Sequence, residues 1–458
     1  MELRLSSPAA QLSPGAPWAA PVSPGPVRTS LRVPGSKSAT NRALLLAALA
    51  DGTSRLERPL RSRDTMLMAR ALRALGVSLV DEGTDDGTKG STDGSTSAAW
   101  VVTGQPVPHE LAPAATVDVG NAGTVARFLP PAAAVLTRGM VHVDGDPRMR
   151  ERPLGPLLQA LAVAGVRLDD AGRGAVPFDL HATGRVAGGS VTVDASSSSQ
   201  LVSGLLLSAP RFDAGIVVHH DGPPVPSAPH LRMTTSMLRE HGATVVEPDE
   251  DAVGKLTWVV QPGRLHPVDR LIEPDLSSAS AFLAAAAATG GEVVLEGWPA
   301  GTEQPGRLLP GLLEAFGCSC LVAGGNLTVR GPDRLSGADL DLHSYGEAAP
   351  TLCALAVLAE SPSRLRGIAH LRLQETDRLA ALAHELGLLG ARVEVTEDGL
   401  AVTPAPLHGG VLDPHADHRL AMAFAVVGLA VPGVEVRDIS TVAKTVPDFP
   451  ERWAGLLR

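Results

Sequence analysis

The chain has 458 residues, 44% of them hydrophobic, so it is long enough to fold into two or more domains with separate cores. Its net charge of −10 and its few aromatic residues (seven Phe, five Trp, one Tyr) argue against a nucleic-acid partner, which would need a basic face and stacking platforms. An anionic small molecule would have to be bound by local cations instead. The three cysteines form no CxxC pair, and we expect reduced thiols in the cytoplasm.

The N-terminal segment, residues 1–27, is rich in Pro, Ala and Ser and lacks the basic and apolar regions of a signal peptide. We expect a flexible tail there. Residues 81–97 are polar and Gly-rich, which predicts a solvated hairpin or loop. No apolar run free of Gly, Pro and charge is long enough to predict a membrane span.

The stretch VPGSKSATNRALLLAALA (33–50) predicts a turn followed at once by an apolar helix. A nucleotide P-loop is excluded, because Ser36 and Leu31 stand where that motif needs glycines. Free backbone N–H groups at a helix start nevertheless attract anions, and Lys37, Ser38 and Arg42 would reinforce that attraction. The alternative is that these side chains only cap or solvate the helix. Lysine is rare here, four residues against 35 Arg, which favours a specific use for Lys37 and Lys444.

A phrase made of a Leu/Ala-rich helix, a glycine and a Val/Leu-rich strand recurs about every 75–90 residues. The chain length then predicts about six such α/β units, of which five are clear in the sequence. We expect the sixth to combine the C-terminal FPERWAGLLR with an N-terminal strand. The five clear copies are MARALRALGVSLV (68–80), PLLQALAVAGVRL (156–168), SMLREHGATVV (236–246), LLEAFGCSCLV (312–322) and LAHELGLLGARVEV (382–395).

Polar or charged groups mark several further helix starts in both halves of the chain. Because backbone N–H groups, hydroxyls and cations all suit anions, their conjunction predicts an interdomain cleft for one or two multiply charged anions. Carboxylates in such a cleft would be available for proton transfer. The groups are Asn121, Gly123 and Arg127; Arg148, Arg150 and Arg152; Ser198, Ser199 and Gln200; Glu347; Glu375, Asp377 and Arg378; and His418 and Arg419.

Seven motifs occur in the order found in the 5-enolpyruvylshikimate-3-phosphate (EPSP) synthase family, and the chain resembles that family over residues 28–458. The motifs are PGSKSATNRALLLAAL, GNAGTVARFL, DPRMRERP, SSSQLVSGLLL, LRLQETDRL, DHRLAMAFAV and AKTVPDFP. The resemblance implies an α/β fold of two inside-out barrel domains, each with three copies of a small α/β unit. It implies a discontinuous domain 1 (28–34 plus 274–458), a domain 2 (35–273) and an active site between them.

The resemblance also implies the reaction. The 5-hydroxyl of shikimate 3-phosphate attacks C2 of phosphoenolpyruvate while C3 gains a proton, and the tetrahedral intermediate then loses phosphate and a methyl proton. No metal and no organic cofactor is implied, and the expected partners are the two small-molecule substrates. We expect a monomer that binds neither nucleic acid nor a membrane.

The roles that the resemblance implies fall into three groups. Glu347 would be the base for the 5-hydroxyl, Glu375 the acid–base group near C3, and Lys37 a cation that touches both substrates. The implied contacts of shikimate 3-phosphate are Lys37, Ser38, Arg42, Ser198, Ser199, Gln200, Ser227, Glu347 and His370. The implied contacts of phosphoenolpyruvate are Lys37, Asn121, Gly123, Arg148, Gln200, Arg378, Arg419 and Lys444.

The sequence departs from the family's pattern at five site positions, one of which is Phe128, which follows Arg127 where Pro is frequent. Glu347 stands where many members have Asp, His370 where Asn is common, Gln374 where Lys is common and His230 where Tyr is frequent. Two other functions stay open. One is enolpyruvyl transfer to UDP-N-acetylglucosamine, which a reactive cysteine near DPRMRERP would favour, and none is present there. The other is a non-catalytic anion-binding protein, in which the carboxylates would be dispensable.

Overall fold

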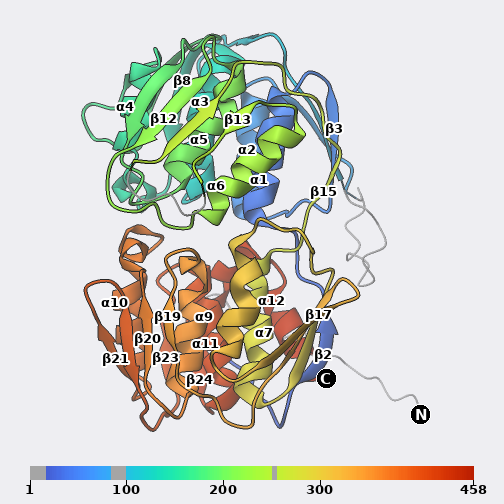
Figure 1. Cartoon of the computed structure of the whole chain (residues 1–458), viewed down its shortest axis with the longest axis vertical. Coiled ribbons are helices and arrows are strands. Elements are labelled where there is room, and N and C mark those ends of the chain that lie inside the picture. Colours follow the sequence, from blue (N-terminus) through green and yellow to red (C-terminus); the bar gives the residue numbers. More distant parts are fainter. Residues whose placement is uncertain (1–16, 84–98, 250–254) are drawn as a thin grey trace.

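The computed structural model describes residues 17–83, 99–249 and 255–458. They form two lobes, one above the other in Figure 1, and each lobe has its own hydrophobic core. The core of the first lobe lies within residues 39–272. The core of the second lobe combines residues 18–33 with residues 276–456. The predicted hairpin at 81–97 lies almost wholly outside the described residues.

The first lobe contains six helices and three sheets among its described residues. The helices are α1 (Lys37–Leu49), α2 (Arg63–Ala74), α3 (Gly123–Leu136), α4 (Gly155–Val163), α5 (Gln200–Ser208) and α6 (Pro229–Glu240). One sheet has the order β15 (Arg270–Leu271), β3 (Thr53–Glu57), β5 (Ala99–Thr103), β4 (Ser78–Asp81). The next runs β6 (His109–Glu110), β8 (Thr137–Asp144), β10 (Phe178–Thr183), β9 (Arg167–Asp169), with β7 (Ala115–Asp118) beside β8. The third runs β11 (Gly189–Val193), β12 (Ile216–His220), β14 (Thr257–Val260), β13 (Val245–Val246).

The second lobe repeats this composition in the residues that the structure describes. Its helices are α7 (Leu276–Thr289), α8 (Leu309–Glu314), α9 (Ala349–Leu358), α10 (Arg378–Gly387), α11 (His418–Ala430) and α12 (Phe449–Gly455). Its first two sheets are β17 (Ser319–Ala323), β18 (Asn326–Arg330), β16 (Glu292–Glu296), β2 (Arg28–Leu31), and β19 (Asp339–Asp341), β20 (Ser363–Arg366), β22 (Leu400–Thr403), β21 (Arg392–Val395). The third is β1 (Trp18–Ala19), β24 (Val434–Val436), β23 (Gly410–Leu412).

Three helices of each lobe lie in its centre, and the sheets lie outside them (Figure 1). The central helices are α1, α3 and α5 in the first lobe and α7, α9 and α11 in the second. They are almost wholly buried, and beyond the polar residues of their first two turns they are mainly apolar, which is the pattern of a helix that packs on every face. The α/β class is therefore confirmed. The sheets of the described residues are open rows of strands, and none of them closes on itself.

The described strands form six sheets, which agrees in number with the predicted units. The sixth unit does combine both ends of the chain, because β1 pairs with β24 beside α12. That pairing corrects the expectation of a flexible tail for residues 17–27. Trp18 is 9% exposed and packs edge-on against Phe449, and Ala20 and Val27 are also buried. Burial of this apolar surface holds a Pro-rich segment that by composition alone resembles a linker.

The chain passes between the lobes in two neighbouring segments. Gly35 pairs with Pro274, and a Cβ on Gly35 would lie 2.5 Å from the carbonyl oxygen of Arg58, so only glycine fits there. The Asp275 carboxylate accepts hydrogen bonds from the backbone N–H of Ser278 (2.8 Å) and of Lys37 (3.0 Å). This single carboxylate therefore caps α7 and also binds the first residue of α1. The central helices α1 and α7 consequently begin at the same junction, on its two sides. Among the described helices, none is long and apolar enough to cross a membrane.

Candidate active site

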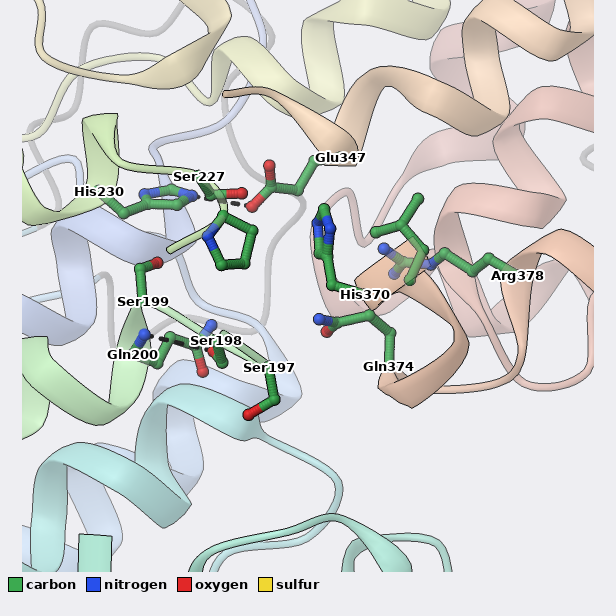
Figure 2. Close-up of a pocket in the computed structure, with 12 residues that line it drawn as sticks. Ser197, Ser198, Ser199, Gln200, Ser227, His230, Glu347, His370, Gln374 and Arg378 are labelled. Carbon is green, nitrogen blue, oxygen red and sulfur yellow. Dashed lines mark hydrogen bonds and ion pairs between the residues drawn. The ribbon is translucent and has the colours of Figure 1, made fainter. Parts of the chain in front are cut away.

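A pocket lies between the lobes and takes its walls from both (Figure 2). The first lobe contributes the start of α5 and the loop that leads into α6. The second lobe contributes Glu347, in the helical turn Gly346–Ala348, the turn Ala369–Leu373 and the first residue of α10. Its lining residues are Ser197, Ser198, Ser199, Gln200, Pro226, Ser227, His230, Glu347, His370, Leu371, Gln374 and Arg378.

The Ser-rich start of α5 presents several uncommitted polar groups to this pocket. The Ser198 hydroxyl accepts a hydrogen bond from the Gln200 backbone N–H (3.2 Å), while the Ser199 side chain makes no cap bond although it precedes the helix. The Gln200 Oε1 is buried and has no hydrogen-bond partner among the described residues. Buried polar atoms are normally paired, so these groups are suited to a polar ligand.

Glu347 and His230 face each other across the pocket from opposite lobes. The His230 Nε2 and the Glu347 Oε1 lie 2.8 Å apart, and the dashed line in Figure 2 marks this contact. The other carboxylate oxygen, Oε2, is buried and has no hydrogen-bond partner in the described part of the chain. Burial alone would raise the pKa of Glu347, but His230 and Arg419 outweigh it and hold that pKa below its usual range. Glu347 is therefore an ionised carboxylate with one free oxygen.

A second cluster of charges joins the lobes beside this pocket. The Lys444 Nζ lies 2.8 Å from the Glu375 Oε1, 3.0 Å from the carbonyl oxygen of Asn121 and 3.7 Å from the Asp64 Oδ2. The Lys37 Nζ lies 3.3 Å from the same Asp64 oxygen. Lys37, Asp64 and Asn121 belong to the first lobe, and Glu375 and Lys444 to the second. Two ammonium groups thus meet two carboxylates at the interface.

The charge state of this cluster follows from burial and from its neighbours. Burial lowers the pKa of Lys37, and the nearby Lys444 adds to that effect against the opposing field of Asp64. Burial would raise the pKa of Glu375, but Lys444 and His418 outweigh it and hold this pKa well below its usual range. The His418 Nδ1 lies 3.0 Å from the Glu375 Oε2. The ionised form of Glu375 therefore depends on cations that an incoming anion could attract away.

The start of α3 lies beside Gln200, which lines the pocket, and a glycine there leaves space for the neighbouring side chains. A Cβ on Gly123 would lie 2.8 Å from the Arg152 Nη2 and 3.0 Å from both the Arg127 Nη1 and the Gln200 Oε1. Arg152 is 5% exposed and donates to the carbonyl oxygen (3.2 Å) and the side-chain oxygen (3.1 Å) of Asn121. The Nε atoms of Arg127 and Arg152 are buried without partners among the described residues. Two buried guanidinium groups with unpaired Nε donors are of the kind that suits an anion.

Three of the predicted shikimate 3-phosphate contacts, Lys37, Ser38 and Arg42, lie outside the lining of the pocket. Ser38 belongs to the first turn of α1, and its carbonyl oxygen accepts from the Arg42 Nη1 (3.1 Å). Arg42 is 1% exposed, donates to the Thr234 hydroxyl (2.8 Å) and to the His230 carbonyl oxygen (3.1 Å), and lies over the ring of Phe128. Arg42 thus holds the start of α6 against α1. Ser198, Ser199, Gln200, Ser227, Glu347 and His370 all line the pocket.

The predicted phosphoenolpyruvate contacts lie around the second cluster. They differ in how many of their side-chain donors already have a protein partner. Arg148 donates to the carbonyl oxygens of Gln374 and Glu375 and to the Glu151 carboxylate, so its guanidinium is already engaged. Arg378 is paired with Asp417 (Nε to Oδ2, 2.7 Å), and both are buried. The guanidinium of Arg419 has no ion pair or hydrogen bond within the described residues. Arg419 donates to Asp417 through its backbone N–H and not through its side chain. Arg419 is therefore the freer of the two C-terminal arginines.

The residues Glu375, Asp417 and His418 are the one group in the described part of the chain that could hold a metal ion, with ligand atoms within 4.8 Å of one another. Lys444 and Arg378 already pair with its two carboxylates. A cation there would have to compete with two buried cationic side chains.

The sequence pattern assigns no substrate contact to three residues of the site: Asp64, Arg152 and His230. Asp64 is an ordinary acidic residue in the first turn of a helix, which gives no local signal. Arg152 is one of three arginines in a single loop, and only burial separates it from Arg148 and Arg150. His230 differs in the sequence only by standing where the resembled family frequently has Tyr. Its partner is 117 residues away in the sequence.

Solved enolpyruvyl transferases share this two-lobed α/β fold. An EPSP synthase from Acinetobacter baumannii matches with a TM-score of 0.72 and 25% identity, over 96% of this chain and 97% of that chain. The enolpyruvyl transferase NikO from Streptomyces tendae matches with a TM-score of 0.71 and 20% identity, over 97% of this chain and 98% of that chain.

The sequence comparisons are more specific. The model of the family EPSP synthase (3-phosphoshikimate 1-carboxyvinyltransferase) matches residues 22–453. A 3-phosphoshikimate 1-carboxyvinyltransferase of Kocuria rhizophila is 50% identical over 445 residues, which are 96% of each chain. The chain belongs to the EPSP synthase family.

Proposed function

We propose that the protein transfers the enolpyruvyl group of phosphoenolpyruvate to the 5-hydroxyl of shikimate 3-phosphate and releases phosphate. This is the 3-phosphoshikimate 1-carboxyvinyltransferase step of the shikimate pathway, which leads to chorismate and the aromatic amino acids. The observation that carries the proposal is the meeting of Lys37 and Lys444, from opposite lobes, beside a pocket that holds the free carboxylate oxygen of Glu347.

The phosphoenolpyruvate subsite would lie around the second cluster. Lys37, Lys444 and Arg419 would bind the phosphate and carboxylate groups, with Asn121, Gln200 and Gly123 shaping the space. Arg378 would act from its pair with Asp417. We assign Arg152 rather than Arg148 to the anion, because Arg152 is buried with a spare donor while Arg148 is engaged with a carboxylate and two carbonyl oxygens.

Shikimate 3-phosphate would occupy the neighbouring pocket. The phosphate would lie at the start of α5, where Ser198, Ser199 and Gln200 offer hydroxyl and amide groups at a helix N-terminus. Ser227 and His370 would hold the ring and its hydroxyls, and Lys37 and Ser38 would face it from α1. Arg42 would support this pocket through its bonds to the start of α6 rather than as an exposed contact.

The proton transfers are assigned to the two carboxylates. The O–H bond of the 5-hydroxyl breaks, its proton passes to the Glu347 Oε2, and the oxygen bonds to C2 of phosphoenolpyruvate. The electron pair of the C2–C3 double bond takes a proton at C3 from Glu375. When substrate anions attract Lys37 and Lys444, Glu375 loses the charges that lower its pKa, so it can hold that proton. The bond between C2 and the phosphate oxygen then breaks, a methyl proton returns to Glu375, and the proton held by Glu347 leaves with the phosphate, so both carboxyl groups return to their starting state.

We further propose that each lobe is a domain of three α/β units with helices inside and sheets outside. Domain 1 would comprise residues 28–34 and 274–458 with the added strand β1, and domain 2 residues 35–273. The two separate hydrophobic cores support this division. The expectations of a monomer, of a cytoplasmic location and of catalysis without metal or cofactor stay predictions.

Phosphate release from phosphoenolpyruvate tests the function. We expect release with shikimate 3-phosphate and none above background with UDP-N-acetylglucosamine, with the Glu347→Gln variant as control. That variant should bind both substrates and lose kcat, because an amide cannot accept the proton. Release with UDP-N-acetylglucosamine alone would refute the assignment. Full activity of the variant would refute the role of Glu347.

A further inference from the structure

His230 contributes a donor to the pocket that the proposed reaction does not yet use. Its side chain is 8% exposed and lies in the first turn of α6, in the first lobe. Its Nε2 contacts the Glu347 Oε1, while its Nδ1 is buried and has no hydrogen-bond partner among the described residues. A buried histidine whose only hydrogen bond from the ring goes to one carboxylate is suited to orient that carboxylate.

Contacts between the segments that precede His230 and Glu347 hold these two residues close together across the interface. The backbone N–H of Ser227 donates to the carbonyl oxygen of His343 (2.9 Å), and the His343 Nε2 lies 3.2 Å from the carbonyl oxygen of Val225. Residues 225–227 lie directly before α6, and His343 lies directly before the turn that carries Glu347. These contacts join opposite lobes, so the His230–Glu347 pair exists only when the lobes are together.

We propose that His230 is the positioning residue for Glu347, and that bringing the lobes together assembles the proton acceptor. This inference rests on the function proposed above. The Nε2–H of His230 donates to the Glu347 Oε1, so the carboxylate cannot rotate freely and its Oε2 stays turned to the substrate hydroxyl. In the separated state Glu347 lacks its partner. Proton removal is thereby restricted to the state in which both substrates are enclosed.

The electrostatic surroundings of Glu347 give the proposal a pH signature. Burial raises the pKa of this carboxyl, and the contact with His230 is the largest of the opposing effects. Removal of His230 should therefore raise the pKa of Glu347 and move the acidic limb of the kcat profile to higher pH. The other charged or titratable groups that act on Glu347 are Arg42, Tyr345, His370, Arg378 and Arg419, and they stay in place.

Two variants separate positioning from other roles. His230→Phe keeps a planar ring without a donor, and we expect kcat to fall about 100-fold, because a misplaced reacting group costs about that much. His230→Gln keeps an N–H donor, and we expect it to recover most of kcat. The KM for phosphoenolpyruvate should stay near that of the wild type in both. His219→Phe is the matched control, since among the described residues the ring of His219 hydrogen-bonds to the Thr257 hydroxyl alone, on a sheet of the same lobe.

The measurement is kcat against pH for the wild type and the three variants, with thermal unfolding as a check of folding. A wild type that does not turn over would refute the proposed function and not this inference in particular. An active wild type with an unchanged acidic limb in His230→Phe would overturn the positioning role. So would a rise in the KM for shikimate 3-phosphate at constant kcat, which would make His230 a substrate contact. If His230→Phe does not fold, a fall of about 100-fold in the kcat of a folded His230→Gln overturns the role, because the retained N–H donor should preserve the position of Glu347.

Discussion

Replacement of Gly123 by alanine tests where phosphoenolpyruvate binds. The added methyl would lie 2.8 Å from the Arg152 Nη2 and 3.0 Å from the Arg127 Nη1 and the Gln200 Oε1, where ordinary contact begins at 3.4 Å. Each of these side-chain ends would have to move by about half an ångström. Overpacking of this kind costs about 1–3 kcal/mol. Because about 1.4 kcal/mol corresponds to a factor of ten, this range predicts that the KM for phosphoenolpyruvate rises by about 5- to 140-fold.

Initial rates of phosphate release give this result when each substrate is varied while the other is saturating. We expect the KM for shikimate 3-phosphate to change little, whereas the thermal midpoint should fall, because overpacking also destabilises the folded protein. Gly155→Ala is the matched control, because Gly155 also begins a helix and its Cβ would meet only Gly174, at 3.7 Å and beyond. An unchanged KM for phosphoenolpyruvate, or an equal rise for both substrates, would refute this location of the subsite.

The remaining predictions concern the arginine loop and the N-terminal strand. Arg152→Lys should raise the KM for phosphoenolpyruvate at least about ten times as much as Arg148→Lys does, because a lysine cannot replace a buried guanidinium fork. Equal KM values for the two variants in steady-state kinetics would contradict this prediction. Trp18→Ala should lower the free energy of unfolding of the second lobe by about 3 kcal/mol. Chemical denaturation measures this, with Val22→Ala at an exposed position as control, and a loss no larger than in the control would mean that β1 adds nothing to the core.

Much of the architecture could be predicted from local pattern. In each recurring sequence unit the helix ends at a glycine, such as Gly76, Gly165 or Gly242. These glycines have a positive φ, which residues with a side chain rarely adopt. The count of units followed from that spacing. The sequence predicts that a sixth unit exists but not where its N-terminal strand begins and ends. The reason is that β1 is only two residues long and is held in place by Trp18 against Phe449 rather than by its own strand propensity.

The sequence predicts those site residues whose role depends on their position at a helix start. It does not predict those whose role depends on burial or on a distant partner. Lys37 could be singled out as a rare lysine beside free backbone N–H groups. The choice between Arg148 and Arg152 depends on which side chain is buried, and that is a property of the packed loop. Arg42 ties α1 to the backbone of His230, and its contact with the substrate stays a prediction.

The sequence by itself determined the α/β class, the repeated unit and the polar helix starts, because each depends on neighbours within a few residues of one another. Only the tertiary structure decided which charges meet. Lys444 reaches Asn121 and Asp64, and His230 reaches Glu347, across an interface that no local pattern encodes. The physical reason is that burial and Coulomb interactions act through space, so the ionisation and orientation of these groups are set by partners that are distant along the chain.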